Sequence, residues 1–485
     1  MARGVGDVWV KNLGSRRNAP RIFFDGLQAV RTRFAPGDKF EVRVGESRVT
    51  LKKKIDGSHT VSRRLGSDGD LPVIDINSKE LLGQFEGMES VRVLIEGDSI
   101  HLLPMASEVN RRARMDRLRA KMAAGAGLAM GSLSHGGGVL SHAIHHGLER
   151  AGIRSSLRFA NEIRDDLLLQ AARHNSAWSA DTRAIGLPMQ ELAQDEWLLD
   201  TLPKLEVLEV GIPCSGASRA GISKKGLTKM EDHEQVGHLV HAALVILQKT
   251  QASIFVVECV PGYAQSASAQ IMRHQLRDMG YDVHEAILDG ADFGCLEARR
   301  RWCMVAVTRG MRFDFREIHP EQKVVRRLSD FLDPTIGPDD PRWRSFSGLF
   351  AKADRDRADG KGFKIQEISP GNDSIPTLRK GYFKAGTTDP LLIHPDDSAR
   401  HRLLTAGEHA NIKGVPREVI DGLSETQAHQ LLGQGIVYAV FEAVGWRLGE
   451  HLAEFSLERM SSRLRDVEAE GLDCEVSARR DRPAG

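Results

Sequence analysis

The 485-residue sequence is poor in cysteine and in aromatic side chains, and it has no long apolar run. Five cysteines are too few for a disulfide framework in a chain of this length, and they favour a reducing, intracellular setting. No apolar run approaches the ~20 residues that a membrane span needs. The first residues also lack the apolar core of a secretory signal. These absences predict a cytoplasmic protein with no membrane segment.

Net charge is also nearly absent, because 67 Lys and Arg balance 66 Asp and Glu. The first 121 residues nevertheless carry 23 basic and 16 acidic side chains, so this part of the chain is basic and the remainder is mildly acidic. The basic excess is greatest at Arg111, Arg112, Arg114, Arg117, Arg119 and Lys121. A helix of this kind could follow nucleic-acid phosphates, here through Arg112 and Arg114, or it could be a solvated linker between domains.

Strand and helix patterns divide the chain into six segments. Short β-branched stretches near the N-terminus alternate with Gly and Asp turns, whereas the middle of the chain alternates apolar strands with amphipathic helices. This second pattern predicts a doubly wound α/β sheet. The predicted segments are a β-rich module (1–104), a basic helical linker (105–127), an α/β domain (128–310), a small irregular domain (311–398), a return to the α/β domain (399–450) and a charged tail (451–485).

The most informative stretch is the loop that contains Pro213 and Cys214. It follows an apolar strand, and open α/β sheets bind their ligands at the carboxyl ends of strands. Pro213 restricts the backbone directly before the sulfur. A thiol in this position can act as a nucleophile, although a buried structural role is the more common one for a single cysteine.

Glu258 ends a second apolar run, where a carboxylate is costly unless it has a partner or a chemical role. Burial would raise its pKa and suit it to donate a proton or a hydrogen bond, but it could instead be a salt-bridged strand end. If residues 297–301 are extended, Glu297, Arg299 and Arg301 share one face. The two arginines could then stabilise a thiolate or hold a carbonyl oxygen, or the stretch could be an exposed charged strand.

A glycine-rich turn, Leu133 to Gly138, follows a small-residue strand and precedes a helix. Such a turn lets a nucleotide-like ligand approach the backbone, and Glu162 follows at the spacing of an acid that binds ribose hydroxyls. Four histidines lie nearby, and we favour histidines on a helix surface over a metal site because no cysteine or acid has ligand spacing. They are His135, His142, His145 and His146.

Taken in order, these segments resemble the cytosine-5 DNA methyltransferases over about residues 128–447. The family's FxGxGG, Pro-Cys and Glu-Asn-Val motifs resemble 133–138, 213–214 and 258–260. Its later motifs, Gln-x-Arg-x-Arg, Arg-x-Leu-Thr-x-x-Glu and Gly-Asn-Ala-Val, resemble residues 297–301, 402–408 and 433–436. The resemblance implies a Rossmann-like S-adenosylmethionine-dependent methyltransferase fold with a small target-recognition domain.

The resemblance also assigns roles to single residues. Cys214 would attack C6 of a flipped-out cytosine, Glu258 would contact N3 and the amino group, Arg301 would hold O2, and Arg299 would support the loop and the acid. S-adenosylmethionine would be the cofactor, contacted by Leu133, Gly136, Gly137, Gly138, Glu162, Asp181, Pro213 and Gln434. The partner would be double-stranded DNA, contacted by Ser218, Arg219, Thr377, Arg379 and Lys380 in addition to Arg112 and Arg114.

The sequence departs from the family pattern at five places, and the first is Leu133, which replaces the aromatic residue expected to stack on the cofactor adenine. His135 replaces a glycine, Cys259 and Gln434 replace asparagines, and Glu297 replaces a glutamine. The nucleophile, the acid and both arginines are kept, which predicts an active enzyme, although the altered turn leaves room for weak binding or for a nonstandard S-adenosylmethionine derivative. Two alternatives remain, a tRNA cytosine-5 methyltransferase and a noncatalytic DNA-binding regulator. The N-terminal module could read DNA or form a homodimer, in a bacterial, phage or plasmid restriction-modification setting.

Overall fold

The computed structural model describes residues 7–66, 69–213, 228–318, 326–360 and 364–455. The chain divides into two compact units, Met1–Ala113 and Arg114–Gly485. No helix in the described ranges is long and apolar enough to cross a membrane.

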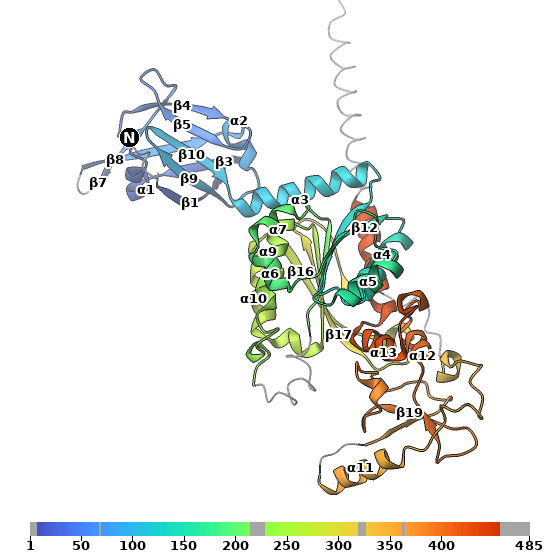
Figure 1. The fold of residues 1–485 in the computed structure, drawn as a ribbon. Coiled ribbons are helices and arrows are strands. Elements are labelled where there is room, and N and C mark those ends of the chain that lie inside the picture. The colour runs from blue at the N-terminus through green and yellow to red at the C-terminus, as the bar shows by residue number, and fades with distance from the viewer. Residues whose placement is uncertain (1–6, 67–68, 214–227, 319–325, 361–363, 456–485) are drawn as a thin grey trace, which may run out of the picture. The chain divides into compact units, whose positions relative to one another are not determined.

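Two antiparallel sheets make up the N-terminal unit (Figure 1). The larger sheet contains, in spatial order, β1 (Val8–Asn12), β9 (Ser90–Glu96), β10 (Ser99–Pro104), β5 (Val49–Lys53), β4 (Lys39–Val44) and β6 (His59–Thr60). The smaller sheet contains β2 (Gly14–Arg16), β3 (Ala19–Phe24), β8 (Gly69–Asn77) and β7 (Ser62–Gly66), with α1 (Gly26–Arg31) and α2 (Lys79–Leu82) beside it. Alternate residues such as Ile22 and Phe24 are buried, which confirms a β-rich region with its own apolar core.

A seven-stranded sheet forms the centre of the second unit (Figure 1). Its spatial order is β13 (Arg183–Ile185), β12 (Ser155–Asn161), β11 (Leu128–Leu133), β14 (Val207–Gly211), β15 (Ile254–Cys259), β17 (Arg300–Thr308) and β16 (Tyr281–Asp289). The first five strands are parallel, and β17 runs antiparallel to both of its neighbours. The parallel strands read as continuous apolar runs because helices cover both faces of the sheet.

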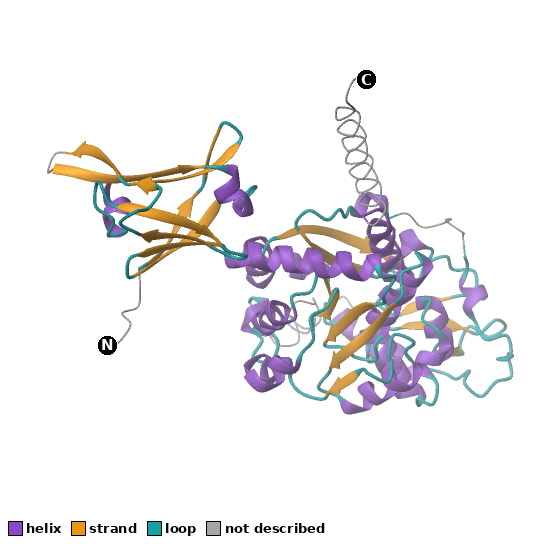
Figure 2. Cartoon of the chain, turned by 90° about the horizontal axis from the view of Figure 1, so that it is seen from above, coloured by secondary structure: helices purple, strands orange, loops and turns teal. Residues whose placement is uncertain are grey.

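Helices lie on both faces of this sheet (Figure 2), which confirms the predicted doubly wound α/β fold. One face packs against α4 (Val139–Arg150), α5 (Asp165–His174), α13 (Glu425–Gln434) and a helical stretch over 438–455. The other face packs against α6 (Met189–Gln194), α7 (Glu196–Thr201), α9 (Leu239–Thr250) and α10 (Ala267–Asp278). The carboxyl ends of the parallel strands therefore form one continuous edge of the sheet.

The basic helix α3 (Ala106–Ala123) uses its charges inside the second unit, at the opposite, amino edge of the sheet. Arg114 is fully buried and donates to Thr308, Gln251 and two backbone carbonyls. Arg117 and Lys121 both pair with the buried Glu206. The prediction that Arg114 contacts DNA is therefore wrong, because its guanidinium is enclosed by protein. Arg112 remains half-exposed, but it donates to Glu108.

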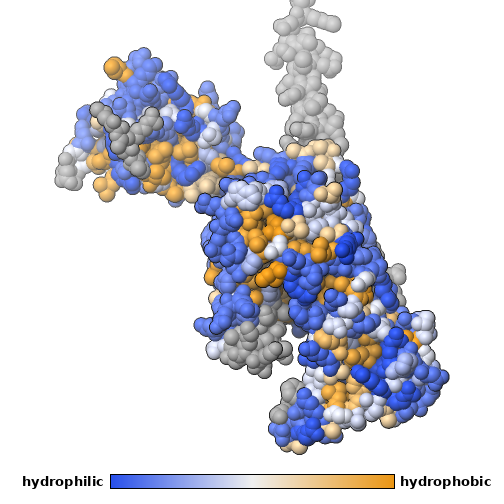
Figure 3. Space-filling view, viewed as in Figure 1, coloured by the Kyte–Doolittle hydropathy of each residue, from blue (hydrophilic) through white to orange (hydrophobic). Residues whose placement is uncertain are grey.

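The small domain predicted at 311–398, here called the recognition region, contains little regular structure. It holds α11 (Ser347–Ala358) and two strands of a three-stranded sheet, β18 (Gln366–Ile368) and β19 (Pro390–Ile393), whose third strand is β20 (His401–Arg402). Hydrophilic and hydrophobic side chains are interspersed over its visible face (Figure 3). The chain then returns through α12 (Ala406–Lys413), where Arg402 and Glu408 form a buried double ion pair.

Candidate active site

The residues predicted to carry the chemistry gather at the carboxyl edge of the large sheet. Strands β11, β12, β14 and β15 are hydrogen-bonded neighbours that end side by side. Leu133 pairs with Val210 in the ladder, and Gly211 pairs with Glu258. The glycine turn, Glu162, Pro213 and Glu258 each lie at or directly after one of these strand ends, so parallel pairing brings them to one edge.

The glycines of the turn let a ligand and the neighbouring helix α13 come close to its backbone. Gly136 and Gly138 have φ values of 57° and 76°, in the left-handed region that favours glycine. A Cβ on Gly137 would lie 2.4 Å from Leu431 of α13, so the turn and this helix pack without room for a side chain. The Gly136 amide donates to Glu162 Oε2 at 2.8 Å. The structure thus brings the turn and the acid of the second strand together, as the sequence predicts.

This geometry fits S-adenosylmethionine, which carries a ribose and a charged amino-acid part. A Cβ built on Gly136 would meet open space, so a ligand can approach that residue. Glu162 also accepts from the Arg164 amide, which fixes the orientation of its carboxylate. Backbone groups beside an oriented acid are the means by which such turns bind a ribose-containing ligand.

His135 occupies the turn as a buried neutral side chain. Its Nδ1 lies 2.7 Å from Ser132 Oγ, and its Nε2 accepts from the Trp178 indole at 3.2 Å. Burial lowers the pKa of His135 to about 3, so the imidazole is uncharged at neutral pH. Leu133 is fully buried in the core that packs against α9 and α10. The prediction that Leu133 contacts the cofactor is therefore wrong for this arrangement of the chain.

Asp181 lies at the wrong edge of the sheet for a cofactor ligand. It precedes β13, whose strand runs parallel to β12, so it sits at the amino end of its strand. Its side chain is 76% exposed and pairs with Arg158 at 3.6 Å. A residue in this position lies at the opposite end of the sheet from the glycine turn, so the prediction that Asp181 binds the cofactor is wrong.

Glu258 and Arg301 form the central pair of the site. Arg301 Nε lies 2.7 Å from Glu258 Oε1, and the two side chains are 13% and 12% exposed. Burial raises the pKa of Glu258, and the nearby Arg301 opposes that rise. A carboxyl group in these surroundings can present a proton to a ligand and can also accept from the arginine.

Cys259 supports the start of the Pro-Cys loop although it replaces the family's asparagine. Its thiol donates to the Ile212 carbonyl at 3.4 Å, and the Ile212 amide donates to the Glu258 carbonyl at 3.0 Å. Two hydrogen bonds therefore hold the residue that precedes Pro213 against β15. Cys214, Ser218 and Arg219 lie outside the described residues, and their roles stay predictions.

Glu297, Arg299 and Lys413 form a fully buried group beside this pair. Arg299 Nη1 donates to Glu297 Oε1 at 3.1 Å, and Lys413 Nζ lies 2.5 Å from Glu297 Oε2. Burial, with Arg299 next in importance, lowers the pKa of Lys413 to about 7. The predicted shared face of Glu297 and Arg299 is present, but sequence reasoning missed Lys413. Its position directly before the Gly414-Val415-Pro416 motif was the one available signal.

The other residues predicted to contact the cofactor or DNA differ in their exposure and in their hydrogen-bond partners. Gln434 is exposed at the end of α13, between two carbonyls that accept from Arg299. Thr377 donates to the Ala298 carbonyl, and Arg379 pairs with the buried Asp389. Lys380 is exposed. These residues stay predictions, with Arg379 already partly neutralised by its partner.

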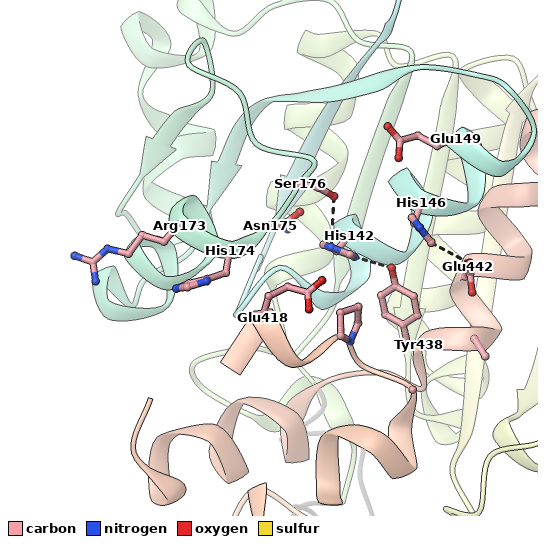
Figure 4. Close-up of a pocket in the computed structure, with 13 residues that line it drawn as sticks. His142, His146, Glu149, Arg173, His174, Asn175, Ser176, Glu418, Tyr438 and Glu442 are labelled. Atoms are coloured by element: carbon pink, nitrogen blue, oxygen red, sulfur yellow. Dashed lines mark hydrogen bonds and ion pairs between the residues drawn. The ribbon is translucent and has the colours of Figure 1, made fainter. Parts of the chain in front are cut away.

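The histidines of α4 have side-chain partners outside the glycine turn. His142 and His145 are buried, so the prediction of a helix surface is wrong for them. His142 contacts the Tyr438 hydroxyl at 2.6 Å beside a cavity of 840 Å³ (Figure 4). This cavity opens between α4, the end of α5 and the 438–455 helix. Among the described residues no His, Cys, Asp or Glu group could hold a metal ion.

Comparison with known proteins identifies a matching family. The model of the C-5 cytosine-specific DNA methylases matches residues 141–450. The Type II methyltransferase M.MspI of Moraxella sp is 26% identical over 246 residues, which cover 50% of this chain and 55% of that protein. The DNA-cytosine methyltransferase of Escherichia coli strain K12 is 28% identical over 320 residues, covering 55% of this chain and 66% of that protein.

A solved structure supports the fold. The crystal structure of the S. pombe Dnmt2 methyltransferase has a TM-score of 0.50 and 17% sequence identity. It covers 68% of this chain and 99% of its own length. The chain spans between about half and two thirds of the length of the curated relatives named above.

Proposed function

Because this chain belongs to the C-5 cytosine-specific DNA methylase family, we propose that it methylates C5 of cytosine in double-stranded DNA. The family uses S-adenosyl-L-methionine as its methyl donor. The observation that carries the proposal is the buried pair of Glu258 on β15 and Arg301 on β17. β15 is the neighbour of β14, the strand that Pro213 and Cys214 follow in the sequence. An acid and an arginine beside a nucleophile's loop are the groups that addition to a pyrimidine requires.

Cys214 begins the proposed reaction. Its thiolate forms a bond to C6 of the base, and the electron pair of the C5–C6 double bond becomes available at C5. S-adenosylmethionine, when bound, would supply the methyl group that C5 takes and would leave as S-adenosylhomocysteine. A base then removes the C5 proton, the double bond re-forms, and the bond between sulfur and C6 breaks to release the thiolate. Cytosine must leave the stack for this attack, so base flipping is part of the proposal.

Glu258 and Arg301 stabilise the charge that thiolate addition places on the ring. A protonated Glu258 donates to N3, and the raised pKa of its carboxyl group supports that role. Arg301, held at 2.7 Å from Glu258, is suited to contact O2 of the base. Both groups are fixed before the substrate arrives, so little reorganisation is needed during the reaction.

The glycine turn and its acid are the proposed cofactor site. Gly136 and Gly138 keep the backbone open, and Glu162 is oriented by the Gly136 amide. Pro213 and Gln434 complete the proposed contacts from the strand end and from α13. The bacterial relatives support a cytoplasmic setting, with double-stranded DNA as partner. A DNA-binding or dimerising role for residues 1–104 is the proposal for the N-terminal unit.

The test mixes the full chain with labelled S-adenosylmethionine and duplex DNA of mixed sequence. Label should enter the DNA and survive in 5-methylcytosine after hydrolysis, and Cys214→Ala should abolish the transfer. Cys303→Ala, which alters a buried thiol on β17, is the matched control and should retain transfer. Label that enters tRNA alone would select the RNA enzyme. DNA binding with no transfer by the unmodified chain would select the noncatalytic regulator.

A further inference from the structure

Glu297 is the point at which three separate segments of the chain meet. It lies three residues before the start of β17 and accepts from Arg299 of its own segment. The backbone amide of Leu378, in the recognition region, donates to the same Oε1 at 3.1 Å. Lys413, the last residue of α12, lies 2.5 Å from the other carboxylate oxygen. One carboxylate therefore joins the arginine strand, the recognition region and the returning chain.

The same junction extends to the end of α13. Arg299 Nη2 donates to the carbonyls of Gly433 and Gly435, at 3.1 and 2.6 Å. These glycines flank Gln434, and Leu431 of the same helix packs against Gly137 of the glycine turn. The recognition region approaches this place too, since a Cβ on Gly433 would lie 2.3 Å from the Lys380 amide nitrogen. Arg299 thus connects Glu297 to the segment that borders the cofactor turn.

Burial makes this arrangement intolerant of losing one partner. Glu297 and Lys413 are both fully buried, and Arg299 is 3% exposed. Removing one member of a buried ion pair leaves the other charge without compensation, which is costly, whereas neutral replacement of both is often tolerated. A changed charge at this junction would displace Arg299, because Glu297 is its hydrogen-bonded partner and the charges of Arg301, Glu258 and Lys413 also act on it.

We infer that Glu297 and Lys413 are a positioning pair that holds Arg299, and through it the Gly433–Gly435 segment, in the geometry that binds the cofactor. The inference rests on the proposed function of the same site and extends it to two residues that touch neither the base nor the cofactor. It also explains the replacement of the family's glutamine by Glu297, because an acid at this position has a buried amine as its partner.

The pair has a pH dependence of its own. The groups whose charges act on Lys413, or on which Lys413 acts, are Glu297, Arg299, Arg301, Glu258, Cys295 and His409. The arginines stay charged at all relevant pH values. Burial raises the pKa of Cys295 to about 11 and lowers that of His409, so both are neutral near pH 7. Loss of the Lys413 proton above about pH 7 would remove one of the two cations that face Glu297 and leave Arg299 as the other.

The experiment measures binding of S-adenosylhomocysteine to the full chain by calorimetry, for the parent, Glu297→Gln, Lys413→Gln and the double variant. Each single variant should bind at least about tenfold more weakly. The double variant, with two amides that can hydrogen-bond, should return to within about threefold of the parent. Asp200→Asn with Lys249→Gln, an exposed ion pair, is the matched control and should not change the affinity.

A pH series gives a second readout that a purely structural role would not move. Between pH 6 and pH 9 the parent should lose at least about threefold in affinity, and the double variant should show a smaller change because Glu258 is its remaining titrating group. The inference would be overturned if the single variants bound S-adenosylhomocysteine as tightly as the parent. It would also be overturned if the double variant bound no more tightly than the weaker single variant. A parent that binds no S-adenosylhomocysteine would instead overturn the proposed function, and this inference with it.

Discussion

The two edges of the large sheet both bury arginines, yet they use them differently. At the amino edge, Arg114 and Arg117 of α3 donate to backbone carbonyls, polar side chains and Glu206. At the carboxyl edge, Arg299 and Arg301 face Glu297 and Glu258. The amino edge leaves no opening for a ligand around Arg114, which is fully buried, whereas Arg301 and Glu258 keep partial exposure.

The difference follows from the geometry of parallel strands. Loops after the strands are free to carry function at the carboxyl edge, while the amino edge can be closed by a helix. In this chain α3 closes it, and its Arg114 and Arg117 donate to backbone carbonyls of residues beside the strand ends. Arginine content alone does not distinguish the two uses, so substitutions at the two edges should separate stability from activity.

The largest expected effect is at the carboxyl edge. Glu258→Gln should lower kcat for methyl transfer by about 10²–10³-fold, because one preorganised group that stabilises the developing charge is lost. The thermal unfolding midpoint should stay within about 2 °C of the parent, since glutamine keeps the volume and a hydrogen bond to Arg301. Steady-state transfer assays and calorimetry on the same preparation check both statements. Equal losses of activity and stability would remove the contrast between the edges.

The reverse result is expected at the amino edge. Arg114→Met should lower the free energy of unfolding by about 3 kcal/mol, since buried hydrogen-bonding groups lose their partner. The kcat of the molecules that remain folded should stay within about twofold of the parent. Urea titration followed by tryptophan fluorescence measures the first quantity. Arg158→Gln, which breaks an exposed pair with Asp181, is the control and should cost less than about 0.5 kcal/mol.

Glu209, on β14 between the two edges, should make the free energy of unfolding depend on pH. Burial raises its pKa to about 8, so it is protonated in the folded protein at neutral pH. A carboxyl with a raised folded-state pKa contributes its full stability below the unfolded pKa and loses it as pH rises toward 8. Glu209→Gln should therefore become more stable relative to the parent between pH 5 and pH 8, by about 2–4 kcal/mol. A constant difference across that range would contradict the shift.

The smallest effect is expected from the N-terminal unit. Residues 1–104 carry 17 basic and 14 acidic side chains, so most of the local basic excess belongs to α3. A chain that starts at Met105 should keep its fold, and the slope of log affinity for DNA against log salt should change by about one or less. A chain that starts at Ala124 loses Arg114, Arg117 and Lys121 and should be destabilised. A slope change well above one in the first truncation would favour the DNA-binding role proposed for residues 1–104, whereas the small change expected here favours the dimerising role.

The sequence predicts the fold class and most of the carboxyl edge because these depend on local order. A strand followed at once by a turn places the next residue at the carboxyl edge, which locates Gly136, Glu162, Pro213 and Glu258 without knowledge of packing. The prediction for Asp181 is wrong because β13 begins after this residue. A strand of only three residues gives too short a pattern to be located in the sequence. An acid before a strand and an acid after it lie at opposite edges.

The surroundings of other residues depend on which distant segments pack together, and the order of residues along the chain does not show this. Whether Arg114 meets solvent or carbonyls depends on where α3 docks, and its partners come from β17, from the residues before β16 and from the end of α9. Lys413 is a partner of Glu297 only after the chain returns from the recognition region. The family motif places Leu133 at the cofactor site. Its side chain instead packs into the apolar core that contacts α9 and α10.

The contact between Glu297 and the recognition region has a consequence for how such regions can be exchanged. Glu297 accepts from the main-chain amide of residue 378, which every residue except proline supplies. The side chain at that position is not read by the carboxylate. A foreign recognition segment could therefore be grafted here and still engage the same anchor, provided that its backbone follows the same path and carries no proline at the joint.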